Sequence, residues 1–89
     1  AKAASVIEVL QEYGMELREP YSKHLKDGIF ELRIQMGTDI NRVLYFFCHD
    51  RRIILTNGFT KKTARTPAGE IQRAQQYRAD YLRRNGSDG

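Results

Sequence analysis

Residues 43–48 read Val-Leu-Tyr-Phe-Phe-Cys and are the longest uninterrupted apolar run of the chain. The run is far too short to cross a bilayer, which takes about 20 residues of helix. A strand that is apolar on both of its alternating faces is typical of the centre of a sheet, where both faces are covered. The run therefore predicts a central β-strand, beginning near Arg42, around which the other elements must pack.

Two further strand patterns lie on either side of this run. Residues 53–59, Ile-Ile-Leu-Thr-Asn-Gly-Phe, predict a strand after it, and short turns at 37–41 and 50–52 separate the patterns. Consecutive strands joined by short turns most often pair with one another, so we expect a three-stranded antiparallel meander. The strand before the run alternates between an apolar face and a solvent-exposed polar face: Phe30, Leu32, Ile34 and Met36 on the first, and Glu31, Arg33 and Gln35 on the second.

Helical spacing is found on both sides of the strands. Apolar residues between Val6 and Tyr13 predict a first helix that ends at Gly14, and residues 14–28 read as a connection. Thr66 and Pro67 predict the start of a last helix, with the Thr66 hydroxyl as its cap. The apolar stripe expected to face the sheet comprises Ile71, Ala74, Tyr77 and Tyr81.

These patterns predict an α+β fold with a small antiparallel sheet and flanking helices, in the order α-β-β-β-α. The 89 residues fit a single domain, expected at 1–84, with a polar tail at 85–89. Cys48 is the only cysteine, so no internal disulfide can form and a reducing cytoplasm is the expected location. The first residues lack the pattern of a secretion signal, and we expect no membrane association.

Charge is distributed unevenly along the chain. The net charge is +4, but residues 60–84 carry seven Lys or Arg against two Asp or Glu. A basic last third suggests an anionic partner such as nucleic acid, although a solvated helix face commonly gives the same count.

Few residues suit conventional enzyme chemistry. His24 and His49 are far apart and have no second ligand type at metal spacing, so we expect no metal site and no cofactor. Cys48 ends an apolar strand and reads as a small core residue, while His49 reads as an exposed hydrogen-bonding side chain. The glycines fall at turns, and no phosphate loop or catalytic triad is recognisable.

The cations are the remaining candidates for a site. In an antiparallel meander, five of the cations would lie on or beside one sheet face: Arg33, Arg42, Lys61, Lys62 and Arg65. They could form a groove for a phosphodiester backbone, or they could simply keep an exposed sheet soluble.

Three separated blocks of the sequence resemble the phage-derived Gp49-like group of toxins, the HigB branch of the RelE/ParE superfamily. The resemblance runs from about Leu10 to Tyr81. Its pattern is a Leu-x-x-Gly-Leu-x-Glu-Leu-Arg strand, an Arg-bearing strand, then Gly-Phe-x-Lys-Lys and a Thr-Pro helix start. The matching residues are Leu25, Gly28, Ile29, Glu31, Leu32, Arg33, Arg42, Gly58, Phe59, Lys61, Lys62, Thr66 and Pro67.

This resemblance implies a toxin of a type II toxin–antitoxin pair, which cleaves mRNA on the ribosome without a metal ion. The expected partners are mRNA on the ribosome and a small antitoxin, with a helix-turn-helix antitoxin as the expected type. The implied catalytic residues are Arg33, Arg42, Lys61 and Lys62, and the residues expected to bind RNA are Lys23, Arg65 and Arg73.

The chain departs from the group in two respects. The superfamily often carries a Tyr near the start of the last helix, where Gly69 and Ile71 stand here, so the general base and acid stay open. The group also has about one strand and one helical stretch more at its N-terminus. We therefore expect an exposed sheet edge or apolar patch, and self-association of the chain.

Two alternative functions fit the same residues. The order α-β-β-β-α with Lys61, Lys62 and Arg65 near the last helix also resembles a double-stranded RNA binding domain. Pro67 disfavours that reading because it starts the helix after the cations and leaves them in a loop. The second alternative is a gyrase-inhibiting ParE-like toxin with the same fold.

Overall fold

The computed structural model describes residues 2–60 and 65–85, which form two α-helices and one four-stranded sheet. Neighbouring strands all pair antiparallel, in the spatial order β1-β2-β3-β4. The α+β class and the meander are thus confirmed, with the order α-β-β-β-β-α. The elements are α1 (Lys2–Tyr13), the 3-10 turn η1 (Gly14–Glu16), β1 (Ser22–Lys26), β2 (Ile29–Met36), β3 (Asp39–Cys48), the 3-10 turn η2 (His49–Arg51), β4 (Arg52–Thr60) and α2 (Ala68–Arg84).

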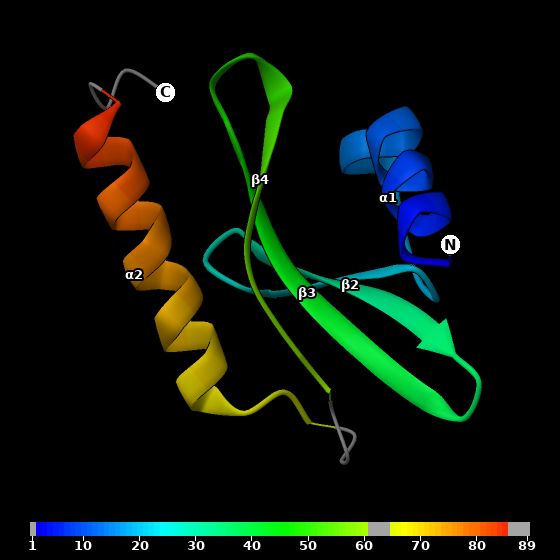
Figure 1. Ribbon diagram of the computed structural model, residues 1–89. Helices are drawn as coiled ribbons and strands as arrows, with labels where there is room; N and C mark the ends of the chain where they lie inside the picture. Colours follow the sequence, from blue (N-terminus) through cyan, green and yellow to red (C-terminus); the bar gives the residue numbers. More distant parts are fainter. Residues whose placement is uncertain (1, 61–64, 86–89) are drawn as a thin grey trace.

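The two helices cover opposite faces of the sheet, as Figure 1 shows, so the molecule has three layers. On the α1 side, Leu10 packs in a buried cluster with Leu32 and Tyr45. On the α2 side, Ala74 packs with Leu44 and Phe46. The consecutive residues 44, 45 and 46 therefore alternate between the two layers, and all three are at most 1% exposed. This confirms the prediction of a central strand covered on both faces.

The strand β1 lies in the segment expected to be a connection. Its residues, Ser-Lys-His-Leu-Lys, contain one apolar side chain, which is too few for a periodic signal. The strand forms because β2 offers a free edge, and because the Ser22 hydroxyl hydrogen-bonds the buried Tyr45 hydroxyl of β3. Gly28 closes the β1–β2 turn with φ +81°, a conformation suited to glycine.

Helix α2 changes the environment of the β2 face that we expected to be exposed to solvent. Ile29 and Glu31 on that face are fully buried, and only its far end, at Gln35, is exposed. The prediction of a wholly exposed polar face is therefore wrong. The apolar stripe of α2 also differs from expectation, because Tyr77 is 49% exposed. The neighbouring Arg78 donates a hydrogen bond to the backbone oxygen of Asp27 in the β1–β2 turn.

The predicted end of the first helix and the predictions for Cys48 and His49 agree with the structure. Helix α1 ends at Tyr13, followed by Gly14 at φ +54°. Cys48 is partly buried against the α2-side cluster, and His49 is exposed. Within the described residues, neither helix has the length and apolar character needed to span a bilayer.

The first prediction tests the layer between β3 and α2. Leu44→Ala should lower the free energy of unfolding by about 2–5 kcal/mol, because Leu44 has no exposed surface and its truncation leaves a cavity. Leu55→Ala on the neighbouring strand is the matched control, since Leu55 is 43% exposed and should cost less than about 1 kcal/mol. Urea denaturation measures both. Equal losses would contradict the assignment of the core.

Candidate nucleic-acid interface

The sheet register brings cations from three strands together on the face that carries α2. Lys23 of β1 is the cross-strand partner of Glu31 in β2, and Arg33 of β2 is the partner of Arg42 in β3. Side chains of directly opposed residues share a face and have Cβ atoms about 4.5–5.5 Å apart. We call Lys23, Arg33, Arg42 and Arg65, together with Glu31 and Thr66, the cation cluster.

Glu31 lies among the sheet cations of this cluster and has no exposed surface. Its Oε1 atom is 4.0 Å from Nε of Arg33 and 3.8 Å from Nε of Arg42. Both distances exceed those of a hydrogen bond, so the contacts are electrostatic. The carboxylate thereby reduces repulsion between the two opposed guanidinium groups without accepting a hydrogen bond from either Nε atom.

Arg42 is unusually buried for an arginine, with 6% of its surface exposed. Among the described residues, none accepts a hydrogen bond from its buried Nε and Nη1 atoms, nor from Nε of Arg33. Burial lowers the pKa of Arg42, Glu31 opposes this shift, and Arg33 adds to it. A buried donor without an acceptor costs about 1–3 kcal/mol, so this guanidinium is suited to an anion that supplies acceptor oxygens.

Thr66 has a different role from the expected helix cap. Pro67 occupies the N-cap position of α2, and no side chain caps the helix there. The Thr66 hydroxyl instead donates a hydrogen bond to Oε2 of Glu31. The helix-cap prediction for Thr66 is therefore wrong, because a buried carboxylate competes for the hydroxyl. This bond ties the residue next to Arg65 to the middle of the sheet.

Two hollows lie beside the cluster. Lys23 and Arg65 line one of about 380 Å³, together with Thr66 and Ile71. Arg33 lines a second of about 250 Å³ near Tyr21, at the edge of the sheet. The structure thus gathers Lys23, Arg33, Arg42 and Arg65 along one side of the sheet. Their roles in binding and catalysis stay predictions.

Among the described residues that were predicted to bind RNA, Arg73 does not join this group. Arg73 lies on α2 with 58% of its side chain exposed, and its Nη1 is 3.9 Å from Oε1 of Glu70. Glu70 Oε1 also accepts a hydrogen bond from Asn57 of β4, so Arg73 belongs to the flank of α2 that faces β4. Lys61 and Lys62 lie outside the described residues.

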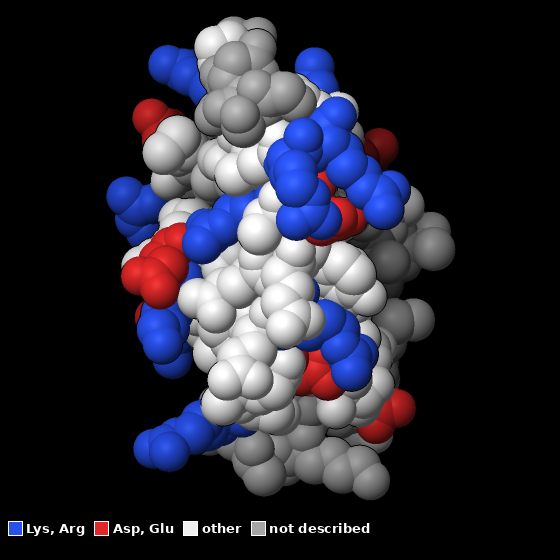
Figure 2. Space-filling view, turned by 90° about the vertical axis from the view of Figure 1, so that its left-hand side faces the viewer, with Lys and Arg blue, Asp and Glu red and all other residues white. Residues whose placement is uncertain are grey.

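On the outer face of the molecule on the α2 side, the described residues form no continuous basic surface. Figure 2 shows its Lys and Arg side chains in separate groups, several beside Asp or Glu. Arg83 and Arg84, for example, both pair with Asp80. Paired surface cations attract a polyanion less than unpaired ones do, so the cation cluster is the better candidate interface.

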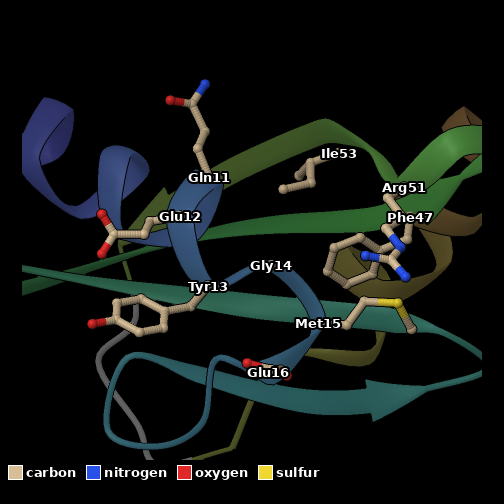
Figure 3. Close-up of a pocket in the computed structure, with 9 residues that line it drawn as sticks. All are labelled: Gln11, Glu12, Tyr13, Gly14, Met15, Glu16, Phe47, Arg51 and Ile53. Atoms are coloured by element: carbon tan, nitrogen blue, oxygen red, sulfur yellow. The ribbon is translucent and has the colours of Figure 1, made fainter.

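A larger hollow, of about 410 Å³, lies at the C-terminal end of α1. Figure 3 shows Met15 and Arg51 beside the ring of Phe47, while Glu12 points away. It is lined by two carboxylates, Glu12 and Glu16, and one cation, Arg51. Two carboxylates and one cation are unfavourable for binding the RNA backbone, so this hollow is not our candidate nucleic-acid interface.

No group of His, Cys, Asp or Glu suited to a metal ion occurs within residues 2–60 and 65–85.

Comparison with known families gives a match over residues 1–79 to the model described as phage derived protein Gp49-like. Among curated proteins, none matches the chain.

The second prediction concerns the hollow between β1 and α2. Lys23→Ala and Arg65→Ala should each weaken binding of a single-stranded RNA several-fold, and each should reduce the slope of log affinity against log salt by up to about one. Arg83→Ala is the matched control, because Arg83 is exposed and pairs with Asp80. Fluorescence anisotropy with a 2′-O-methyl RNA, which cannot be cleaved through its 2′-oxygen, measures the affinities. Equal effects of all three substitutions would contradict a localised interface.

Proposed function

Because the chain belongs to the phage-derived Gp49-like family, which is related to the RelE and HigB toxins, we propose that it is the toxin of a type II toxin–antitoxin pair and cleaves mRNA on the ribosome. The observation that carries this proposal is the pair of opposed arginines, Arg33 and Arg42. Both have buried N–H groups from which no described residue accepts a hydrogen bond. Such donors suit a phosphodiester group.

The proposed reaction is attack of a ribose 2′-oxygen on the adjacent phosphorus, with departure of the 5′-oxygen of the next nucleotide, which takes a proton from solvent and becomes a 5′-hydroxyl. Negative charge grows on the phosphoryl oxygens during this step, and Arg33 and Arg42 stabilise it. Removing one preorganised donor of this kind costs about 10²–10³ in rate. Lys61 or Lys62, from the segment between β4 and α2, takes the 2′-hydroxyl proton if neighbouring cations lower its pKa.

The four strands of the described structure disfavour the double-stranded RNA binding alternative. The resemblance to a double-stranded RNA binding domain depended on the order α-β-β-β-α, which has three strands. The structure has a fourth strand, β1, before them. The alternative of a gyrase inhibitor shares the superfamily fold and becomes an outcome of the growth experiment below.

We further propose that a small antitoxin protein silences the chain. Exposed apolar side chains support a protein partner: Tyr13 and Met15 next to the hollow of Figure 3, together with Tyr21, Leu55 and Tyr77 elsewhere. Self-association through an open edge, β1 or β4, is the expected behaviour without that partner.

The third prediction addresses the two lysines outside the described residues. Lys61→Ala with Lys62→Ala should abolish growth inhibition, because the pair is expected to act on the reacting group. Substitutions of surface charges usually change stability by less than about 0.5 kcal/mol, and a thermal melting curve of the variant establishes whether it folds. Induced expression with translation and gyrase assays measures the effect. Full toxicity of the folded variant would contradict the assigned role, and gyrase inhibition with intact mRNA would favour the ParE-like alternative.

The fourth prediction concerns the products. Cleavage should leave a 2′,3′-cyclic phosphate, or the 3′-phosphate formed when it opens, and DNA should not be cut because it lacks the nucleophile. On free RNA, excess chelator should leave the slow cleavage rate unchanged, since arginines are proposed to stabilise the developing charge. Cleavage should be much faster on ribosome-bound mRNA, which is held in a reactive geometry. Primer extension and end-group analysis test these points, and a 3′-hydroxyl product would contradict the mechanism.

A further inference from the structure

Glu31 is a carboxylate in a place where an apolar side chain would be expected on physical grounds. It lies in the middle of β2, with no exposed surface, between Lys23 of β1 and Leu44 of β3. Removing a carboxylate from water costs several kcal/mol, and the attraction of a buried pair does not reliably repay that cost. Stability alone is therefore a poor explanation for Glu31.

The two oxygens of Glu31 contact different parts of the chain. Oε1 lies near both sheet arginines, at 4.0 Å from Nε of Arg33 and 3.8 Å from Nε of Arg42. Oε2 accepts the hydrogen bond from the Thr66 hydroxyl, and Thr66 is itself 8% exposed. One carboxylate therefore connects cations of the sheet with the segment that leads into α2.

The contact with the arginines has a specific consequence. Opposed like charges on neighbouring strands repel each other, and without a counter-charge Arg33 and Arg42 would turn apart toward solvent. Glu31 offsets this repulsion at a distance too long for a hydrogen bond to either Nε atom. The two guanidinium groups are therefore held together while their Nε–H groups can still donate hydrogen bonds to a ligand.

The contact with Thr66 acts on the neighbouring Arg65. Arg65 and Thr66 line one hollow with Lys23, and Lys23 is the cross-strand partner of Glu31. Holding Thr66 against the sheet therefore holds Arg65 on the same side as Lys23 and the sheet arginines.

We propose that Glu31 is a positioning residue, which assembles Arg33, Arg42 and Arg65 into one anion-binding site through its two oxygens. The part of this proposal that concerns RNA rests on the proposed function, whereas the arrangement of the arginines does not. Glu31 touches no substrate in this proposal and acts through the arginines and Thr66.

The sign of a charge substitution distinguishes this role from simple electrostatics. Glu31→Gln removes one negative charge, so long-range attraction alone would strengthen RNA binding. Loss of the positioned arginines should instead weaken binding of a 2′-O-methyl RNA at least tenfold. Glu12→Gln on α1 is the matched control, since Glu12 is exposed and lies on the opposite side of the sheet. Binding by Glu31→Gln that is unchanged or tighter would overturn the proposal.

Thr66 supplies a second variant in case Glu31→Gln fails to fold. Thr66→Val keeps the side-chain shape but removes the hydroxyl donor, and it should weaken RNA binding several-fold and lower the salt slope by about one as Arg65 loses its place. Thr66→Ser retains a hydroxyl and should restore both. A purely structural role would lower the melting temperature of Thr66→Val without changing the salt slope of the folded protein, and that result would overturn the proposal.

An experiment without RNA separates this proposal from the proposed function. In ¹H–¹⁵N spectra of the free protein, the Nε–Hε signals of Arg33 and Arg42 should be distinct from those of solvent-exposed arginines and should move toward them in Glu31→Gln. Unmoved signals would overturn the positioning role whatever the RNA results are. Moved signals in a protein whose wild type neither binds nor cleaves RNA would sustain the positioning role and overturn the proposed function alone.

Discussion

Glu31 has no exposed surface, and a carboxylate in such a place persists only while positive charge and hydrogen-bond donors surround it. The sheet supplies Arg33 and Arg42, and the segment before α2 supplies the Thr66 hydroxyl. The candidate site depends on this arrangement, because the same carboxylate permits two arginines to oppose each other across β2 and β3. Without it, Arg33 and Arg42 would face each other across the two strands with no counter-charge between them.

The three-layer architecture creates the environment for that carboxylate. β3 is buried on both faces, and α2 covers the face that also carries Glu31. The apolar part of this layer lies around Ala74 and Phe46, while the charged part lies near the beginning of α2. Burial lowers the local dielectric, which strengthens each charge interaction and makes each unpaired donor of Arg42 more costly. Packing and the candidate function therefore involve the same sheet face.

Much of this fold could be predicted from the sequence, because its strongest signals are periodic. The apolar run at 43–48 and the alternation in 30–36 correctly indicate two paired strands, and Gly14 marks the end of α1. The strand β1 has one apolar residue and forms through pairing with β2, so no local sequence pattern predicts it.

The candidate site was harder to predict than the fold. The expected meander placed Arg33 and Arg42 on or beside one sheet face, and the register of the structure sets them directly opposite each other. Glu31 and Thr66 were missed as partners because 35 positions separate them and only the docking of α2 brings them together. The sequence showed only that Glu31 has the same parity as Arg33, whereas the burial of Glu31 beneath α2 is known from the structure. A buried carboxylate in a strand needs a cation or a hydrogen-bond donor as its partner.

The most direct test of the account is a crystal structure of the protein with a short single-stranded RNA that carries 2′-O-methyl sugars. We predict one phosphate with its oxygens at hydrogen-bonding distance, about 2.7–2.9 Å, from guanidinium nitrogens of Arg33 or Arg42, and the flanking phosphate near Lys23 and Arg65. RNA bound instead along the outer face of α2 beside Arg83 and Arg84, with Arg33 and Arg42 untouched, would contradict the account.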